Sequence, residues 1–110
     1  MSHVTNMNSM FKGCSNLEKI NITNVNISLV KDMNNLFLEC SNLKSIDLSN
    51  LDFSNVIFMN SMFRGCSNLE NINLTNINTS SVRFIKYLFS YYTNLKSIDL
   101  SSFDFKNYFF

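Results

Sequence analysis

Apolar and polar residues follow one another along the chain in a fixed order that recurs. The stretch from Phe11 to Ile22 returns with the same spacing at Phe37, Phe63 and Phe89, so the step between copies is 26 residues each time. A constant step of about 20 to 50 residues is typical of proteins made of stacked repeats. We therefore predict an elongated array in which each repeat packs on its neighbours.

The first part of each repeat carries apolar residues at helical spacing. In the first copy the positions i, i+3, i+6, i+7 and i+10 are occupied by Val4, Met7, Met10, Phe11 and Cys14. This spacing places the side chains on one face of an α-helix. The pattern therefore predicts a short amphipathic helix in every repeat.

The second part of each repeat alternates between apolar and polar residues. Ile20 and Ile22 alternate with Lys19, Asn21 and Thr23, and the later copies keep the alternation. A period of two predicts a short strand, and strands separated by a helical crossover pair in parallel. The predicted fold class is an α/β repeat solenoid with one short parallel strand and one short helix per repeat. We expect a single domain over 1–110, with repeats 4–29, 30–55, 56–81 and 82–107 and a tail at 108–110.

Two other repeat positions allow local predictions. Gly13 and Gly65 share their position with Glu39 and Tyr91, so we expect a backbone there that does not require positive φ. A second position is always asparagine, and its amide is expected to bond to the turning backbone of its own and the next coil. The asparagines are Asn16, Asn42, Asn68 and Asn94.

Charge excludes some classes of partner. Nine Lys and Arg residues balance eight Asp and Glu residues, giving a net charge of +1. Such a balance provides no basic patch for phosphates, so no nucleic-acid partner is expected. No stretch reaches the roughly 18 apolar residues of a membrane helix, and the first residues do not resemble a secretory signal. One repeat position carries charges that alternate between negative and positive from copy to copy, namely Glu18, Lys44, Glu70 and Lys96.

The cysteines are the main candidates for reactive chemistry. Cys14, Cys40 and Cys66 share one repeat position, which Tyr92 fills in the last copy, so the position selects for bulk. We interpret them as buried core thiols, with a disulfide between neighbours or a metal site as weaker alternatives. His3 is the single histidine and no nucleophile is marked by a motif. We therefore expect no enzyme activity, no cofactor and no metal.

The run from Met59 to Leu69, continuing through Ile72 to Leu74, resembles the 26-residue repeats of the BspA-like leucine-rich-repeat surface proteins. The resemblance covers the chain from Val4 to about Asn107 and implies a leucine-rich-repeat-like, right-handed coil. It also implies adhesion or host contact at a cell surface or outside the cell, although no signal or anchor is present in the sequence. The last copy departs from the pattern by carrying Tyr-Tyr-Thr where the family has Gly-Cys-Ser.

The polar residues of the strands are the candidate partner-binding face, because they alternate with the apolar ones and point outward. They include Lys19, Asn21, Ser45, Asp47, Asn71, Asn73, Ser97 and Asp99. We expect contacts to centre on Asp47, Asn73 and Asp99, in a non-catalytic protein- or glycan-binding module of the adhesion type. The alternative is a structural spacer, or a fragment of a longer array, with no site of its own. Self-association through the uncapped ends is also expected.

Overall fold

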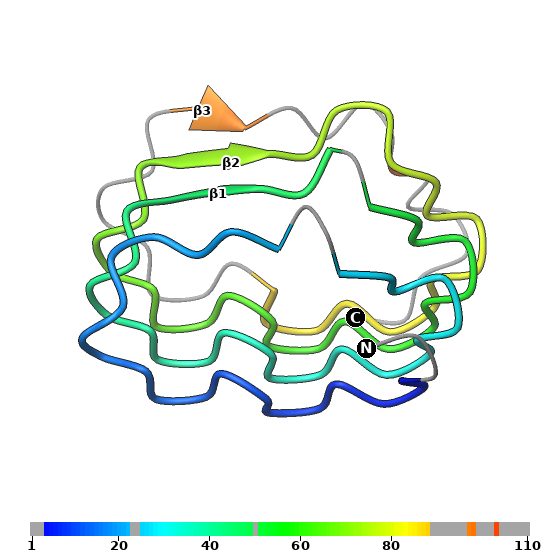
Figure 1. The fold of residues 1–110 in the computed structure, drawn as a ribbon, viewed down its shortest axis with the longest axis horizontal. Helices are drawn as coiled ribbons and strands as arrows, with labels where there is room; N and C mark the ends of the chain where they lie inside the picture. Colours follow the sequence, from blue (N-terminus) through cyan, green and yellow to red (C-terminus); the bar gives the residue numbers. More distant parts are fainter. Residues whose placement is uncertain (1–3, 23–24, 50, 89–96, 99–102, 104–110) are drawn as a thin grey trace.

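Short parallel strands form one wall of the molecule. The structure is a computed structural model that describes residues 4–22, 25–49, 51–88, 97–98 and 103. Strands β1 (Ser45–Asp47), β2 (Asn71–Asn73) and β3 (Ser97–Ile98) form a sheet in the order β1-β2-β3. Ile46 pairs with Ile72, and Ile72 with Ile98, so the parallel register advances by one sequence repeat per strand. Figure 1 shows the strands stacked along the upper side.

The opposite wall is a ladder of chain segments that run side by side. Isolated parallel bridges join Asn6 to Asp32, Asp32 to Phe58, and Phe58 to Phe84. Backbone hydrogen bonds extend each contact along the segments, as when the Phe11 N–H donates to the Leu36 carbonyl at 3.0 Å. In Figure 1 these segments lie below the sheet as stepped, parallel traces. The two walls enclose the core.

The predicted helices are wrong. No helix occurs in the described ranges, and the segments predicted to be helical consist of consecutive turns. Residues at one repeat position have φ between 57 and 61°, which breaks a right-handed helix at the same point in each copy. These residues are Ser9, Asn35, Ser61 and Tyr87. Apolar residues spaced by about three positions still face inward, because each turn also advances by about three residues.

Within these turns, backbone N–H groups alternate between two kinds of partner. The Met10 and Lys12 N–H groups donate to carbonyls three residues earlier, at 3.2 and 3.1 Å. The Ser9 and Phe11 N–H groups donate sideways to the next segment, both at 3.0 Å. A helix would satisfy all of these groups within one segment. Each segment here instead depends on its neighbour for half of its hydrogen bonds.

The predicted fold class, an α/β leucine-rich-repeat-like solenoid, is therefore contradicted. The described residues contain no helix, and the strands are two or three residues long. The expected elongated shape is also wrong, since the body measures 31 × 28 × 20 Å. The four-repeat division remains a prediction, because much of the last copy lies outside the described residues.

The prediction about the glycine position is also wrong. Gly13 and Gly65 have φ of 73 and 78°, and Glu39 adopts 59° at the equivalent position. Positive φ is thus a property of this turn in all three copies that the structure describes. Glu39 accepts the strained backbone because its N–H donates to the Arg64 carbonyl, at 2.7 Å.

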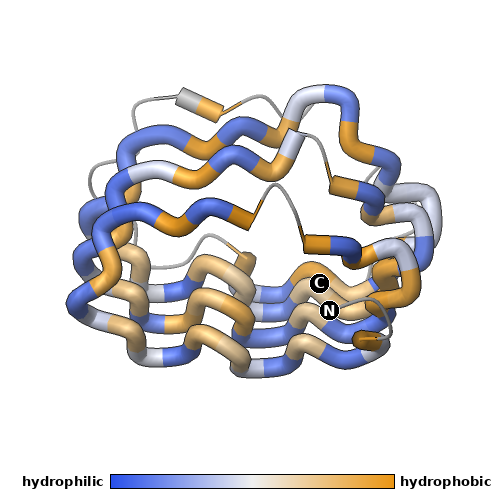
Figure 2. The backbone as a smooth tube through the Cα atoms, in the orientation of Figure 1, coloured by the Kyte–Doolittle hydropathy of each residue, from blue (hydrophilic) through white to orange (hydrophobic). Residues whose placement is uncertain are grey.

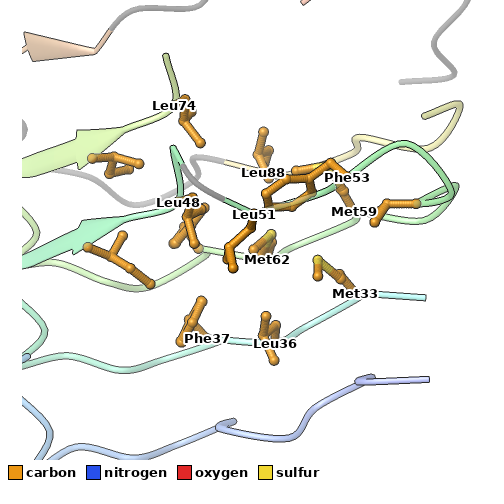
Figure 3. Packing of buried hydrophobic residues seen from close by; sticks show 14 of the residues in the cluster. Met33, Leu36, Phe37, Leu48, Leu51, Phe53, Met59, Met62, Leu74 and Leu88 are labelled. Carbon is orange, nitrogen blue, oxygen red and sulfur yellow. The ribbon is translucent and has the colours of Figure 1, made fainter. Parts of the chain in front are cut away.

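Apolar side chains from both walls fill the space between them. Leu48 and Leu74 from the strand wall belong to the same buried cluster as Met33, Phe37 and Met62 from the turn wall (Figure 3). Figure 2 shows polar and apolar positions alternating along both walls. The alternation predicted for the strands is confirmed, because Ile46 and Ile72 are buried while their chain neighbours are half-buried or exposed.

Three phenylalanine rings form a column inside the turn wall. The ring centroids of Phe11 and Phe37 lie 5.6 Å apart and those of Phe37 and Phe63 lie 5.5 Å apart, with nearly parallel planes. Phe37 and Phe63 are fully buried, whereas Phe11 is half-buried. Equivalent residues in neighbouring segments therefore pack on each other as well as on the opposite wall.

Candidate partner-binding surfaces

Two open grooves run over the outer side of the strand wall. One, with a volume of about 380 Å³, lies over the three strands, between Ser45 and Ile98. The other, of about 450 Å³, extends from Lys19–Ile22 to Ser45–Asp47. The two grooves share β1 and so form one continuous surface, which we call the strand groove.

The structure brings most of the predicted site residues to the strand groove. Its lining includes Lys19, Asn21, Ser45, Asp47, Asn71 and Asn73. All of them are exposed except Ser45, which is half-buried. Ser97 is placed by its backbone pairing with Asn71. Asp99 lies outside the described residues, so its predicted role is not tested.

Two of these residues also hold the backbone at the end of their strands. The Asp47 Oδ1 atom accepts hydrogen bonds from the Ser49 N–H at 2.9 Å and the Ser49 hydroxyl at 2.6 Å. The Asn73 Oδ1 atom accepts the equivalent bonds from Thr75 at 3.1 and 2.8 Å. The side-chain and backbone bonds from Ser49 lower the pKa of the Asp47 carboxyl. Sequence reasoning found the exposure of these residues but missed this structural role.

The predicted charge column is confirmed for one pair. Lys44 Nζ lies 3.9 Å from Glu18 Oε1, on neighbouring segments, and both side chains are more than half exposed, at 56 and 65%. An exposed pair at this distance contributes little to stability. Lys96 lies outside the described residues.

The asparagine prediction is confirmed in part. The Asn68 amide donates to the Ser41 carbonyl at 2.8 Å, and the Asn42 amide donates to the Ser15 carbonyl. The bond from amide to backbone is as predicted, but each amide reaches the preceding segment, whereas the prediction named its own and the next one. Their common role is structural, because each bond satisfies a carbonyl that the sheet does not reach.

The cysteine column is part of the core. Cys40 and Cys66 are buried, Cys14 is half-buried, and all three are free thiols. The Cys40 Sγ atom donates to the Phe11 carbonyl at 3.0 Å, and Cys66 Sγ donates to the Phe37 carbonyl at 3.1 Å. Burial raises the pKa of Cys40 and raises that of Cys66 to about 12. Such thiols are poor nucleophiles and poor metal ligands at neutral pH.

Groups suited to metal binding do not gather in the described ranges. No cluster of three His, Cys, Asp or Glu side chains occurs there. No helix in the same ranges has the length and apolar character that a membrane crossing requires.

A second groove, which sequence reasoning missed, lies where the turn wall begins. It has a volume of about 320 Å³ and is lined by Lys31, Asn55, Ile57, Ser81 and Arg83. Its cations occupy one repeat position two copies apart, and this shared position was the signal in the sequence. We call it the cationic groove.

The structure thus belongs to the class of compact proteins built from parallel segments that lateral backbone hydrogen bonds join, with open grooves on the surface. The family described as "Mycoplasma protein of unknown function, DUF285" matches residues 1–103. The chain therefore belongs to this family. Neither the comparison with curated proteins nor that with solved structures produced a match.

Proposed function

We propose that the chain is a non-catalytic binding module of the adhesion type, related to the BspA-like surface proteins, and that it contacts a protein or glycan through the strand groove. The observation that carries the proposal is the continuity of this groove across neighbouring segments. Its exposed amide, hydroxyl and carboxylate groups are suited to hydrogen bonding with a polar ligand. The sequence resemblance to adhesion proteins supports the same conclusion.

The groove favours many weak contacts. Its lining alternates polar side chains with the edges of buried Ile46 and Ile72, and none of its described residues is aromatic. Tight protein interfaces usually centre on buried aromatic or arginine anchors. A groove without them is better suited to recognition strengthened by several copies acting together.

A structural spacer is the second candidate, and one observation favours it. Asp47 and Asn73 already use an oxygen to hold the following turn. Their exposure therefore has an explanation that requires no partner. The two candidates make different predictions for groove residues whose side chains hold no turn, such as Lys19 and Asn71.

The test is binding of the purified chain to a glycan array and to a panel of immobilised extracellular-matrix proteins. We expect at least one immobilised ligand to bind the wild-type chain. The same ligand should bind the Asn71→Ala variant about tenfold more weakly, since one polar contact contributes about that factor. Lys19→Ala extends the test to the part of the strand groove that lies between Lys19 and Asp47. The matched control is Asn16→Ala, which removes an exposed amide outside both grooves.

If the two variants Asn71→Ala and Lys19→Ala bind the immobilised ligand as tightly as the wild type, the proposed role of the strand groove is contradicted. An absence of capture from both panels would favour the spacer. Circular dichroism melts of all three variants distinguish lost binding from lost folding.

A further inference from the structure

The cationic groove gathers donors from three neighbouring segments. Lys31, Ile57 and Arg83 follow one another across the turn wall, where the Ile57 N–H donates to the Lys31 carbonyl at 2.9 Å and the Arg83 N–H to the Ile57 carbonyl at 3.0 Å. Segments paired in this way are about 4.8 Å apart, so the two cationic residues are separated by roughly 10 Å at the backbone. Their long side chains can both reach a small group seated over Ile57.

Arg83 is oriented by the backbone beneath it. Its Nη1 atom donates to the Ser80 carbonyl at 2.9 Å and to the Val82 carbonyl at 2.8 Å. These bonds fix the plane of the guanidinium group, while within the described residues Nε and Nη2 have no protein acceptor. A guanidinium held in this way loses little conformational freedom when it binds an oxyanion through its remaining donors.

The carboxylate nearest in sequence to the groove is engaged elsewhere. Asp32 follows Lys31, but its Oδ1 atom accepts from the Asn34 N–H at 2.9 Å and its Oδ2 atom accepts from the Asn8 amide at 3.3 Å. Among the described residues, neither Lys31 nor Arg83 forms an ion pair with a carboxylate. The groove therefore holds two positive charges that the described protein does not neutralise.

We propose that the cationic groove binds an oxyanion, the sulfate, phosphate or carboxylate group of a ligand, between Lys31 and Arg83. The Ser81 hydroxyl lines the same groove and supplies a neutral polar group beside the charges. The Asn55 amide also lines it, and its Nδ2 atom donates to the Ser28 carbonyl at 2.6 Å. The ligand is either a free anion or an acidic group carried on a sugar. This site goes beyond the proposed function, since it shares no residue with the strand groove.

The experiment measures binding of the whole chain to inorganic sulfate, to inorganic phosphate and to a heparin-derived oligosaccharide, with neutral dextran as the uncharged control. Isothermal titration gives the affinities, and amide chemical shifts locate the bound anion. We expect saturable shifts at Ser81 and Arg83 with at least one anionic probe, and none with dextran. Binding of the oligosaccharide without the inorganic ions assigns the source to an acidic sugar, and comparable binding of the ions assigns it to a free anion.

The key variant is Lys31→Glu, because this side chain is exposed and holds no described contact. It should weaken binding by about tenfold or more, since it replaces attraction with repulsion at the ligand. Lys12→Glu makes the same charge change on an exposed lysine outside the groove and should change the affinity less than about twofold. Arg83→Gln adds a test of the second cation, and its melt shows whether the fold is retained.

Equal weakening by Lys31→Glu and Lys12→Glu would overturn the proposal, since it would show general attraction by charge. Saturation by none of the anionic probes would overturn it as well. Neither result bears on the proposed function of the strand groove, because that proposal is tested with different residues and different probes.

Discussion

At the scale of single residues, Asp47 and Asn73 show how one turn is held by two different side chains. Each presents an Oδ1 acceptor to the residue two positions later, at 2.9 and 3.1 Å from its N–H group. The amide of Asn73 performs this role without charge. The turn therefore requires the oxygen and not the carboxylate.

Asp47→Asn should lower the melting temperature only slightly at neutral pH, because the acceptor remains although the charge that strengthens its bonds is lost. Asp47→Ala should lower it, because the Ser49 N–H and hydroxyl both lose their partner. Thermal melts of the two variants check this prediction. A melting temperature that falls equally in both would show that the charge holds the turn.

The asparagine column gives a second prediction with an internal control. Asn68→Ala removes the bond to the Ser41 carbonyl and should reduce the free energy of unfolding by about 1 kcal/mol. Asn16 has the same repeat position but makes no such bond in the described structure, so Asn16→Ala should be nearly silent. Urea titrations of both variants measure the difference. Equal losses of unfolding free energy in the two variants would mean that the asparagine contributes through turn propensity alone.

The thiol of Cys66 makes stability depend on alkaline pH. Burial raises its pKa from 9.0 to about 12, so the folded chain keeps a proton that the unfolded chain releases in this window. The resulting stabilisation is fully present below pH 9 and is lost as the pH rises from 9 towards 12. The free energy of unfolding should therefore fall with increasing pH across this window.

Urea titrations between about pH 8 and about pH 11 measure the fall, and Cys66→Ala is the comparison. This variant should be less stable throughout, because it leaves a cavity, but its stability should fall less steeply with pH. The remaining titratable groups are the same in both proteins, so their contributions cancel in the comparison. Identical slopes would contradict the assigned pKa of Cys66.

At the scale of elements, burial was predictable while the backbone was not. Met33, Phe37 and Cys40 are buried as their spacing predicted, because a helix and a succession of turns both return to the same face after about three residues. The difference lies in the sign of φ at Asn35 and Glu39, which their residue types do not specify. Helical periodicity alone therefore located the inner face but assigned the wrong element.

The same reasoning explains the outcome for the candidate sites. The exposure of Asp47 and Asn73 follows from the two-residue period of a strand, which requires no knowledge of the rest of the fold. The cationic groove joins Lys31 to Arg83, far apart in sequence, and its shape depends on the path of the turns. Without the correct turn geometry, the sequence placed those cations in one column but could not show a groove between them.

The left-handed turn position provides a prediction at this scale. A Cβ atom at Gly13 would have no neighbour within 4 Å, whereas at Gly65 it would lie 3.2 Å from Glu39 Cγ. Both alanine substitutions should reduce the free energy of unfolding by about 1 to 2 kcal/mol, because φ is positive. Gly65→Ala should exceed Gly13→Ala by the cost of displacing Glu39.

A double-mutant cycle checks the contact. Glu39→Ala removes the crowding atom, so the difference between Gly65→Ala and Gly13→Ala should shrink in its presence. Urea denaturation supplies the stabilities of the wild type, the three single variants and the two double variants. A difference that Glu39→Ala does not alter would show that the side-chain contact is unimportant and that backbone strain is the whole effect.

At the scale of the whole molecule, the compact shape follows from the number of segments. Segments about 4.8 Å apart reach a depth of only about 15 Å when four are stacked. Each segment is longer than that, so the body is broader than its stack is deep, in agreement with its extents of 31 × 28 × 20 Å. The prediction of an elongated array was wrong because four layers at this spacing form a stack shallower than each segment is long.

Because each segment takes hydrogen bonds from its neighbours, the outer segments should unfold locally more often than the inner ones. The Phe37 N–H donates to the Met62 carbonyl inside the stack, whereas the Phe11 N–H donates from the first described segment, which has one described neighbour. Amide protons of Met33 and Phe37 should therefore exchange with solvent more slowly than those of Met7 and Phe11. Native-state hydrogen exchange measures the rates. Uniform protection across these four amides would mean that the molecule opens only as a unit.

The sideways hydrogen bonds also set the mechanical behaviour of the chain. They point from one segment to the next, so a pull that separates the outer segments loads one row of bonds at a time. A pull along the segments would load all the bonds of a row together and would meet a higher resistance. The molecule should accordingly peel at low force in the first direction and shear at high force in the second, and a tether attached at different points would measure both.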